Sequence, residues 1–99
     1  MPTEMQDEAK RYLNLEMEVI EGVAMINCDV ARKFLEQLPG RIKYFVKNHQ
    51  PDDNKELYLN SIGHEINKRA GSYGEYAKGS FFEELSDKLK DINKEIRKW

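Results

Sequence analysis

The sequence predicts an all-α fold, a small antiparallel bundle of three to four helices in which the N-terminal helix is long or kinked. Two observations lead to this prediction. When residues 5–38 are placed on a helical wheel at about 100° per residue, apolar side chains gather on one broad arc and charged side chains on the other. In the last part of the chain, apolar residues step by three and four from Phe82 to the C-terminus. Three or four such faces can enclose one core.

The N-terminal region, residues 5–38, also contains a stretch that resembles a strand. Its apolar arc holds Met5, Ala9, Tyr12, Leu13, Val19, Ile20, Val23, Ala24, Ile26, Val30, Ala31, Phe34, Leu35 and Leu38, with Leu15, Met17 and Met25 at the margins. Between Leu13 and Val19, however, apolar and polar residues alternate, and Glu21-Gly22 would suit the tip of a hairpin. The alternative is therefore a small α+β fold with a hairpin at residues 13–28. We favour the helix because it accounts for some thirty residues of pattern and the strand for about seven.

Two acidic residues, Glu16 and Asp29, fall near the middle of the apolar arc. Asp29 is explained if the helix breaks near Asn27 and restarts with Asp29 as its N-cap, because a carboxylate can accept hydrogen bonds from the N–H groups of a first turn. For Glu16 we expect either an ion pair with a Lys or Arg of another helix or a position where the apolar arc meets solvent. The competing hypothesis makes Glu16 a catalytic base.

The middle of the chain is expected to contain a short segment between two breaks. Leu38-Pro39-Gly40 should end the first helical region, because proline removes a donor and disfavours helix in the residue before it. Residues 41–48 are ambiguous, and we favour helix over strand because no partner strand is evident. Residues 49–54, HQPDDN, have the composition of a loop.

Two further helices are expected in the second half of the chain. The first should run from about Asp53 to Ala70, with Gly71 as its C′ residue. A glycine-rich connection over residues 71–80 follows. Ser80 and Glu83 then form an S-x-x-E capping box at the start of the last helix.

Length, charge and cysteine content restrict the class of protein. The 99 residues suffice for one domain, residues 1–99, and the net charge of −2 gives no global attraction to nucleic acid or anionic lipid. The chain has one cysteine, Cys28, and neither a signal peptide nor an apolar run of membrane-spanning length. We therefore expect a cytoplasmic protein that does not bind membranes, present as a monomer or small homodimer.

The common catalytic and metal-binding motifs are missing from the sequence. His64-Glu65 resembles the start of a zincin helix, but Lys68 stands where the second histidine is required. No pattern for a di-iron centre, a calcium loop or a phosphate loop is complete. The sequence therefore predicts no metal, no cofactor and no enzymatic activity. The remaining enzymatic hypothesis pairs Glu16 with a histidine and requires a concave pocket.

Two segments are candidates for binding a partner. The glycine-rich loop at residues 71–80 and the residue that follows it offer Tyr73, Tyr76, Lys78 and Phe81, and tyrosine is enriched in interaction surfaces because it brings a large rigid area with a polar tip. The alternative for these aromatic side chains is that they pack on the bundle. The basic segment 32–47 offers Arg41, Lys43, Tyr44 and Lys47 as a nucleic-acid-binding group.

The profile as a whole suggests a non-enzymatic protein–protein interaction module. We expect a small cytosolic inhibitor, immunity, regulatory or accessory protein, of the kind that mobile elements encode, which acts by binding a larger protein. Its acidic N-terminal third, with six acids and two bases in residues 1–28, would suit a basic surface on that partner. The alternative is a nucleic-acid-binding regulator that uses the basic segment 32–47.

Overall fold

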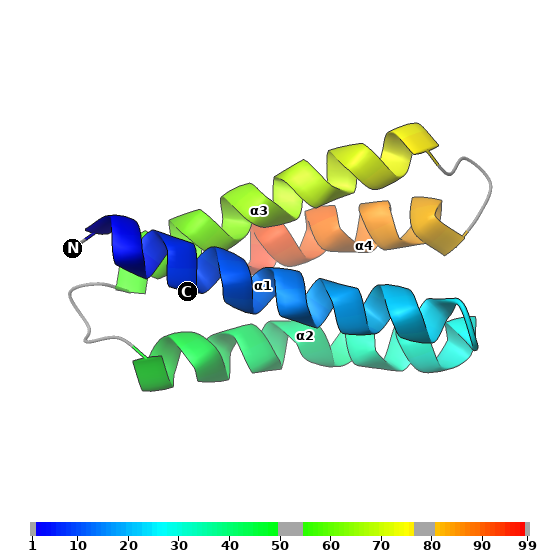
Figure 1. Ribbon diagram of the computed structural model, residues 1–99, viewed down its shortest axis with the longest axis horizontal. Coiled ribbons are helices and arrows are strands. Elements are labelled where there is room, and N and C mark those ends of the chain that lie inside the picture. Colours follow the sequence, from blue (N-terminus) through cyan, green and yellow to red (C-terminus); the bar gives the residue numbers. More distant parts are fainter. Residues whose placement is uncertain (1, 50–54, 77–80, 99) are drawn as a thin grey trace.

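The computed structural model describes residues 2–49, 55–76 and 81–98. In these ranges the chain forms four α-helices and no strand: α1 (Pro2–Ala24), α2 (Cys28–His49), α3 (Lys55–Tyr76) and α4 (Phe81–Ile96). Successive helices run antiparallel (Figure 1). Packing is closest between α3 and α4, while α1 contacts α2 and α3, and α2 also contacts α4. The all-α bundle is thus confirmed, and the hairpin alternative is wrong because residues 13–24 lie within α1.

Each helix contributes one buried stripe to a single core. The buried apolar residues are Ala9, Leu13, Met17 and Ile20 of α1, Ala31, Leu35, Leu38, Ile42, Phe45 and Val46 of α2, Tyr58, Leu59, Ile62, Ile66 and Ala70 of α3, and Leu85, Leu89, Ile92 and Ile96 of α4. Their spacing of three and four residues is the helical period that the sequence shows. Among the described residues, no helix is both long and apolar enough to cross a membrane.

The expected long N-terminal helix is two helices joined by a tight turn at residues 25–27. The Asn27 side-chain Oδ1 accepts hydrogen bonds from the backbone N–H groups of Asp29, at 2.9 Å, and Val30, at 3.3 Å. Asn27 is therefore the N-cap of α2, and the assignment of that role to Asp29 is wrong. Asp29 instead accepts a 2.6 Å hydrogen bond from Arg32 on the exposed surface.

The buried stripe is narrower than the apolar arc of the helical wheel. Val19, Ile26 and Val30 fall together at one edge of that arc, away from the buried residues such as Leu13 and Leu35. In the structure all three are exposed. Met17, at the margin of that arc, is fully buried, whereas Leu15 at the other margin is 63% exposed.

Helix α2 continues through Pro39 and Gly40, so the predicted end at residues 38–40 is wrong and residues 41–48 are helical. An interior proline costs a helix about 3 kcal/mol. The turns that follow it bury Ile42 and Phe45, and burial of each such side chain contributes about 1.5–3 kcal/mol. Packing of the C-terminal half of α2 therefore outweighs the local cost of the proline.

Helix α3 likewise continues past its predicted end at Ala70 and Gly71. It extends to Tyr76, because Tyr73, one turn after Ala70, still packs against α4, with its ring centroid 5.5 Å from that of Phe82. Gly71 is exposed and an added Cβ there would meet no atom within 4 Å, so the position does not require glycine. The predicted start at Asp53, the Ser80 half of the capping box, and Trp99 lie outside the described residues.

Candidate functional site: an open groove between α1 and α2

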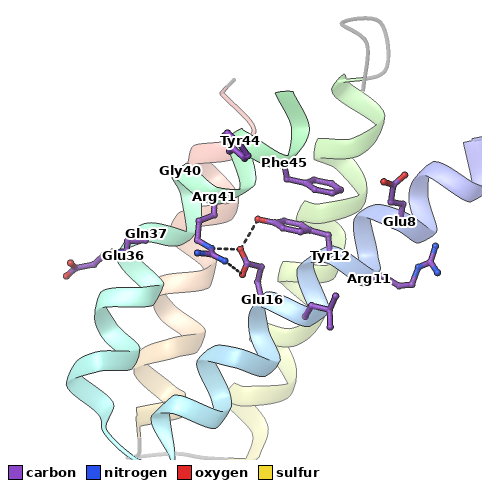
Figure 2. Close-up of a pocket in the computed structure, with 11 residues that line it drawn as sticks. Glu8, Arg11, Tyr12, Glu16, Glu36, Gln37, Gly40, Arg41, Tyr44 and Phe45 are labelled. Carbon is purple, nitrogen blue, oxygen red and sulfur yellow. Dashed lines mark hydrogen bonds and ion pairs between the residues drawn. The ribbon is translucent and has the colours of Figure 1, made fainter. Parts of the chain in front are cut away.

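An open groove, about 1130 Å³ in volume, lies between α1 and α2. In the described part of the chain, its lining residues come from these two helices (Figure 2). The lining residues fall between residues 8 and 16 of α1 and between residues 36 and 45 of α2. Gly40 helps to keep the groove open, because it lines the groove and a Cβ there would meet no atom within 4 Å.

Stacked aromatic rings form part of the groove lining and connect it to the core. The rings of Tyr12 and Phe45 lie parallel, with centroids 4.0 Å apart and an interplanar angle of 4°. Phe45 in turn packs against Tyr58 of α3, with ring centroids 5.7 Å apart and an interplanar angle of 58°. The Tyr58 hydroxyl donates a 3.0 Å hydrogen bond to Glu8, at the groove edge. The groove therefore rests on side chains that three helices hold in place.

A hydrogen-bonded group of three side chains forms the wall of the groove (Figure 2). Arg41 donates from Nε to Glu16 Oε2 at 2.6 Å and from Nη2 to Glu16 Oε1 at 2.8 Å, and the Tyr12 hydroxyl donates to Glu16 Oε2 at 2.9 Å. Burial and the neighbouring Glu16 carboxylate raise the pKa of Tyr12 far above its usual value. The ion pair predicted for Glu16 is confirmed, since the residue is only 8% exposed and its partner comes from α2.

This arrangement does not resemble an acid–base pair. Both Glu16 oxygens already accept hydrogen bonds, and His64 lies on α3 and does not line the groove. Among the described residues, no three His, Cys, Asp or Glu side chains gather as a metal site would require. The groove offers apolar rings and satisfied charges, which suit binding better than proton transfer.

Exposed apolar side chains line part of the groove and continue along the hairpin toward the turn. Six large apolar residues are exposed in the described part of the chain, and every one lies on α1, on α2 or in the turn between them: Leu15, Val19, Met25, Ile26, Val30 and Tyr44. We call these six residues, together with the groove, the hairpin surface. Leu15 and Tyr44 line the groove, and Val19 lines a small adjoining hollow with Phe34. No family model, curated protein or solved structure matches this chain.

Two of the four residues predicted near the α3–α4 connection are placed, and both pack on the bundle. Tyr73 is partly buried, its hydroxyl accepts a 3.2 Å hydrogen bond from Arg69, and burial raises its pKa to about 12. Phe81 is partly buried, with the Arg32 guanidinium 5.3 Å from its ring centroid. The Tyr76 side chain and Lys78 lie outside the described residues. Tyr73 and Phe81 thus offer a partner less area than the hairpin surface does.

The four residues of the basic segment lie on α2 but do not form one stripe. Arg41 turns toward α1 and pairs with Glu16, while Tyr44, 71% exposed, lines the groove. Lys43 and Lys47 are exposed one turn apart. Elsewhere in the segment, Arg32 pairs with Glu84 of α4 at 2.6 Å. Nucleic-acid binding by these residues stays a prediction.

Sequence reasoning missed Leu15, Val19 and Tyr12 as site residues. The signal that could have revealed Leu15 and Val19 is the breadth of the apolar arc, because the two residues lie one turn apart at its edge, away from the buried residues of α1. The stacking of Tyr12 on Phe45 depends on the pairing of α1 with α2, which no local pattern specifies.

Proposed function

We propose that this protein is a non-enzymatic protein–protein interaction module, a small cytoplasmic inhibitor, immunity or accessory protein that binds a larger partner through the hairpin surface. One observation supports this proposal above the others. All six exposed large apolar side chains of the described residues lie on one helical hairpin, and α3 and α4 contribute none. Scattered exposed apolar residues are normal, but their restriction to one helical hairpin, with two of them in its groove, is typical of an interaction site.

The groove has the composition of a protein-binding surface. Its aromatic lining provides rigid area, and Leu15 and Tyr44 provide apolar contacts on the two opposite helices. Aromatic residues contribute strongly to protein interfaces because they bury a large area at a low entropic cost. The Glu16–Arg41 pair already satisfies its own charges, so a partner can cover it without leaving an unpaired ion.

Charge favours a protein over nucleic acid as the ligand. Although α2 carries five bases and two acids, the neighbouring α1 carries six acids and two bases. A phosphate backbone laid over the groove would therefore approach Glu8 and Glu36, which line it. Nucleic-acid binding needs a basic field that is continuous over several phosphates, and α1 interrupts such a field here.

The test is affinity capture from a lysate of the source cells with tagged variants. Leu15→Lys/Val19→Lys places two charges on the hairpin surface, and Asn60→Lys/Ser72→Lys places two charges on exposed positions of α3 as the matched control. We expect a stoichiometric protein partner that the wild type and the control retain and the hairpin variant loses. Each capture is run with and without nuclease.

Two results would contradict the proposal. Capture of the same partner by the hairpin variant would remove the hairpin surface as the binding site. Recovery of nucleic acid alone, lost in nuclease or high salt and after Lys43→Glu/Lys47→Glu, would replace the proposal with the nucleic-acid-binding alternative.

A further inference from the structure

The two helices that form the hairpin surface carry opposite net charge. Helix α1 has six acidic and two basic residues, whereas the adjacent α2 has five basic and two acidic ones. Ion pairs within the bundle use Glu16, Glu21, Arg32 and Arg41. Exposed acids still remain on α1, as at Asp7 and Glu18, and exposed bases on α2, as at Lys33 and Lys47. The surface therefore contains both halves of a complementary pair.

Two symmetric arrangements can bring the hairpin surfaces of two copies together, and only one of them places opposite charges against each other. When two hairpin surfaces meet face to face, a two-fold axis perpendicular to the helices lays α1 on α1 and α2 on α2, which brings like charges together. A two-fold axis parallel to the helices lays α1 of one copy on α2 of the other. This second arrangement pairs the acidic helix α1 with the basic helix α2 twice, as expected for an isologous interface.

The axis parallel to the helices also aligns the exposed apolar residues. Rotation about this axis leaves the height of each residue along the bundle unchanged. Within one copy, Tyr12 lies level with Phe45, and Glu16 lies level with Arg41. Leu15 of one copy consequently comes within one helical turn of the height of Tyr44 of the other copy. Both side chains are largely exposed in the single chain, at 63% and 71%.

The hairpin side is large enough for such an interface. The bundle measures 41 × 23 × 22 Å, and the product of its long extent and one short extent gives a projected area of about 900 Å² for one long side. A standard interface buries roughly 800 Å² per partner.

We propose that a second copy of this chain covers the hairpin surface in the free protein, in a dimer whose two-fold axis runs parallel to the helices. The inference rests on the proposed function, since it assigns an occupant to the same surface. It adds a form of regulation, because a larger partner then binds only after the two copies separate. Apparent affinity for the partner falls as the concentration of the chain rises.

Sedimentation velocity over about 1–300 µM tests the dimer, on the full chain and with the same two double variants. We expect the wild type and Asn60→Lys/Ser72→Lys to dimerise within this range, and Leu15→Lys/Val19→Lys to remain monomeric. Each lost apolar contact should raise the dissociation constant about tenfold or more. A wild type that stays monomeric throughout, or a dimer that the hairpin variant retains, would overturn the proposal. Far-UV circular dichroism of each variant shows whether the bundle is intact.

Cross-linking tests the direction of the axis. In a Cys28→Ser background, Leu15→Cys and Tyr44→Cys chains with tags of different size are treated with a short bismaleimide, each alone and as an equal mixture. The parallel axis predicts that the mixed product dominates. Dominance of the Leu15→Cys product with itself would indicate the perpendicular axis and overturn the proposal.

The experiments can contradict the dimer without contradicting the proposed function, and the reverse. A monomeric chain that still loses its partner on Leu15→Lys/Val19→Lys would remove the dimer and leave the proposed function standing. A dimer that this variant disrupts, combined with partner capture that it does not affect, would leave the dimer and remove the hairpin surface from the proposed function.

Discussion

The Arg41 guanidinium holds the Glu16 carboxylate across the seam of α1 and α2 in a two-pronged contact, with Nε 2.6 Å from Oε2 and Nη2 2.8 Å from Oε1. The two residues are 25 positions apart in the chain. The pair is asymmetric in its exposure, because the Arg41 side chain is 55% exposed and the Glu16 side chain only 10%. Removing the arginine is therefore more harmful than the value of an exposed ion pair suggests, since a nearly buried carboxylate loses two donors and keeps the hydrogen bond from Tyr12 (Figure 2).

We expect Arg41→Ala to lower the free energy of unfolding by about 1–3 kcal/mol, the usual cost of an unsatisfied buried polar group. Glu16→Gln/Arg41→Ala should cost less than Arg41→Ala alone, because a neutral amide is cheaper to bury and still accepts a hydrogen bond from Tyr12. Urea denaturation of the wild type, of these two variants and of Glu16→Gln gives a double-mutant cycle for the Glu16–Arg41 pair. A double variant less stable than Arg41→Ala would show that the carboxylate does not need its partner.

Two partly buried tyrosines predict a loss of stability at alkaline pH. Burial raises the pKa of Tyr73 to about 12 and that of Tyr12 further, above the value of 10.0 for an ordinary tyrosine. A raised pKa in the folded state means that the unfolded chain loses its proton first. The stabilising contribution of Tyr73 is therefore fully present below pH 10 and is lost as the pH rises through about 12.

Urea midpoints measured from pH 8 to pH 11 at constant ionic strength should fall above about pH 10. Tyr73→Phe and Tyr12→Phe should each make this fall shallower. Tyr44→Phe is the matched control, because its side chain is 71% exposed, and it should keep the wild-type slope. Equal slopes in all three variants would mean that the alkaline loss comes from other groups.

Two glycines in helix interiors should respond in opposite directions to the same substitution. Gly40 has open space where a Cβ would lie, so Gly40→Ala should stabilise the protein by about 0.5–1 kcal/mol through the higher helix propensity of alanine. At Gly63 of α3 a Cβ would lie 2.6 Å from Oδ1 of Asn93 and 3.0 Å from Arg97.

The Asn93 side chain cannot move away from Gly63 cheaply. It is 7% exposed, donates a 2.8 Å hydrogen bond to Asn67 and accepts one of 3.2 Å from Arg97. We therefore expect Gly63→Ala to destabilise the protein by about 1–3 kcal/mol. Thermal melts of both variants compare them directly, and a stabilising Gly63→Ala would show that α3 and α4 can separate slightly without loss.

Periodicity in the sequence is sufficient for the all-α class but not for the helix ends or the site, and particular residues show why. Periodicity identifies the core of α4 at Leu85, Leu89, Ile92 and Ile96, because one amphipathic helix meets one core. Pro39 and Gly71 are strong local breakers, yet the helices pass through both positions because packing of later turns outweighs the local cost. The groove needs the antiparallel pairing of α1 and α2, which brings Tyr12 to Phe45 from 33 positions away, and no local signal encodes this contact.

The turn between α1 and α2 offers a direct comparison of the two N-cap assignments. Asn27 Oδ1 accepts hydrogen bonds from two backbone N–H groups of the first turn of α2, and Asp29 accepts none of these. Asn27→Ala should therefore lower the free energy of unfolding by about 1 kcal/mol, the typical value of an N-cap side chain. Asn27→Asp should retain stability, since a carboxylate can replace the amide oxygen and is favoured at a helix N-terminus. Asp29→Ala should cost less than Asn27→Ala, because it removes only the exposed contact with Arg32. Urea denaturation at pH 7 ranks the three variants, and a larger loss for Asp29→Ala than for Asn27→Ala would return the N-cap role to Asp29.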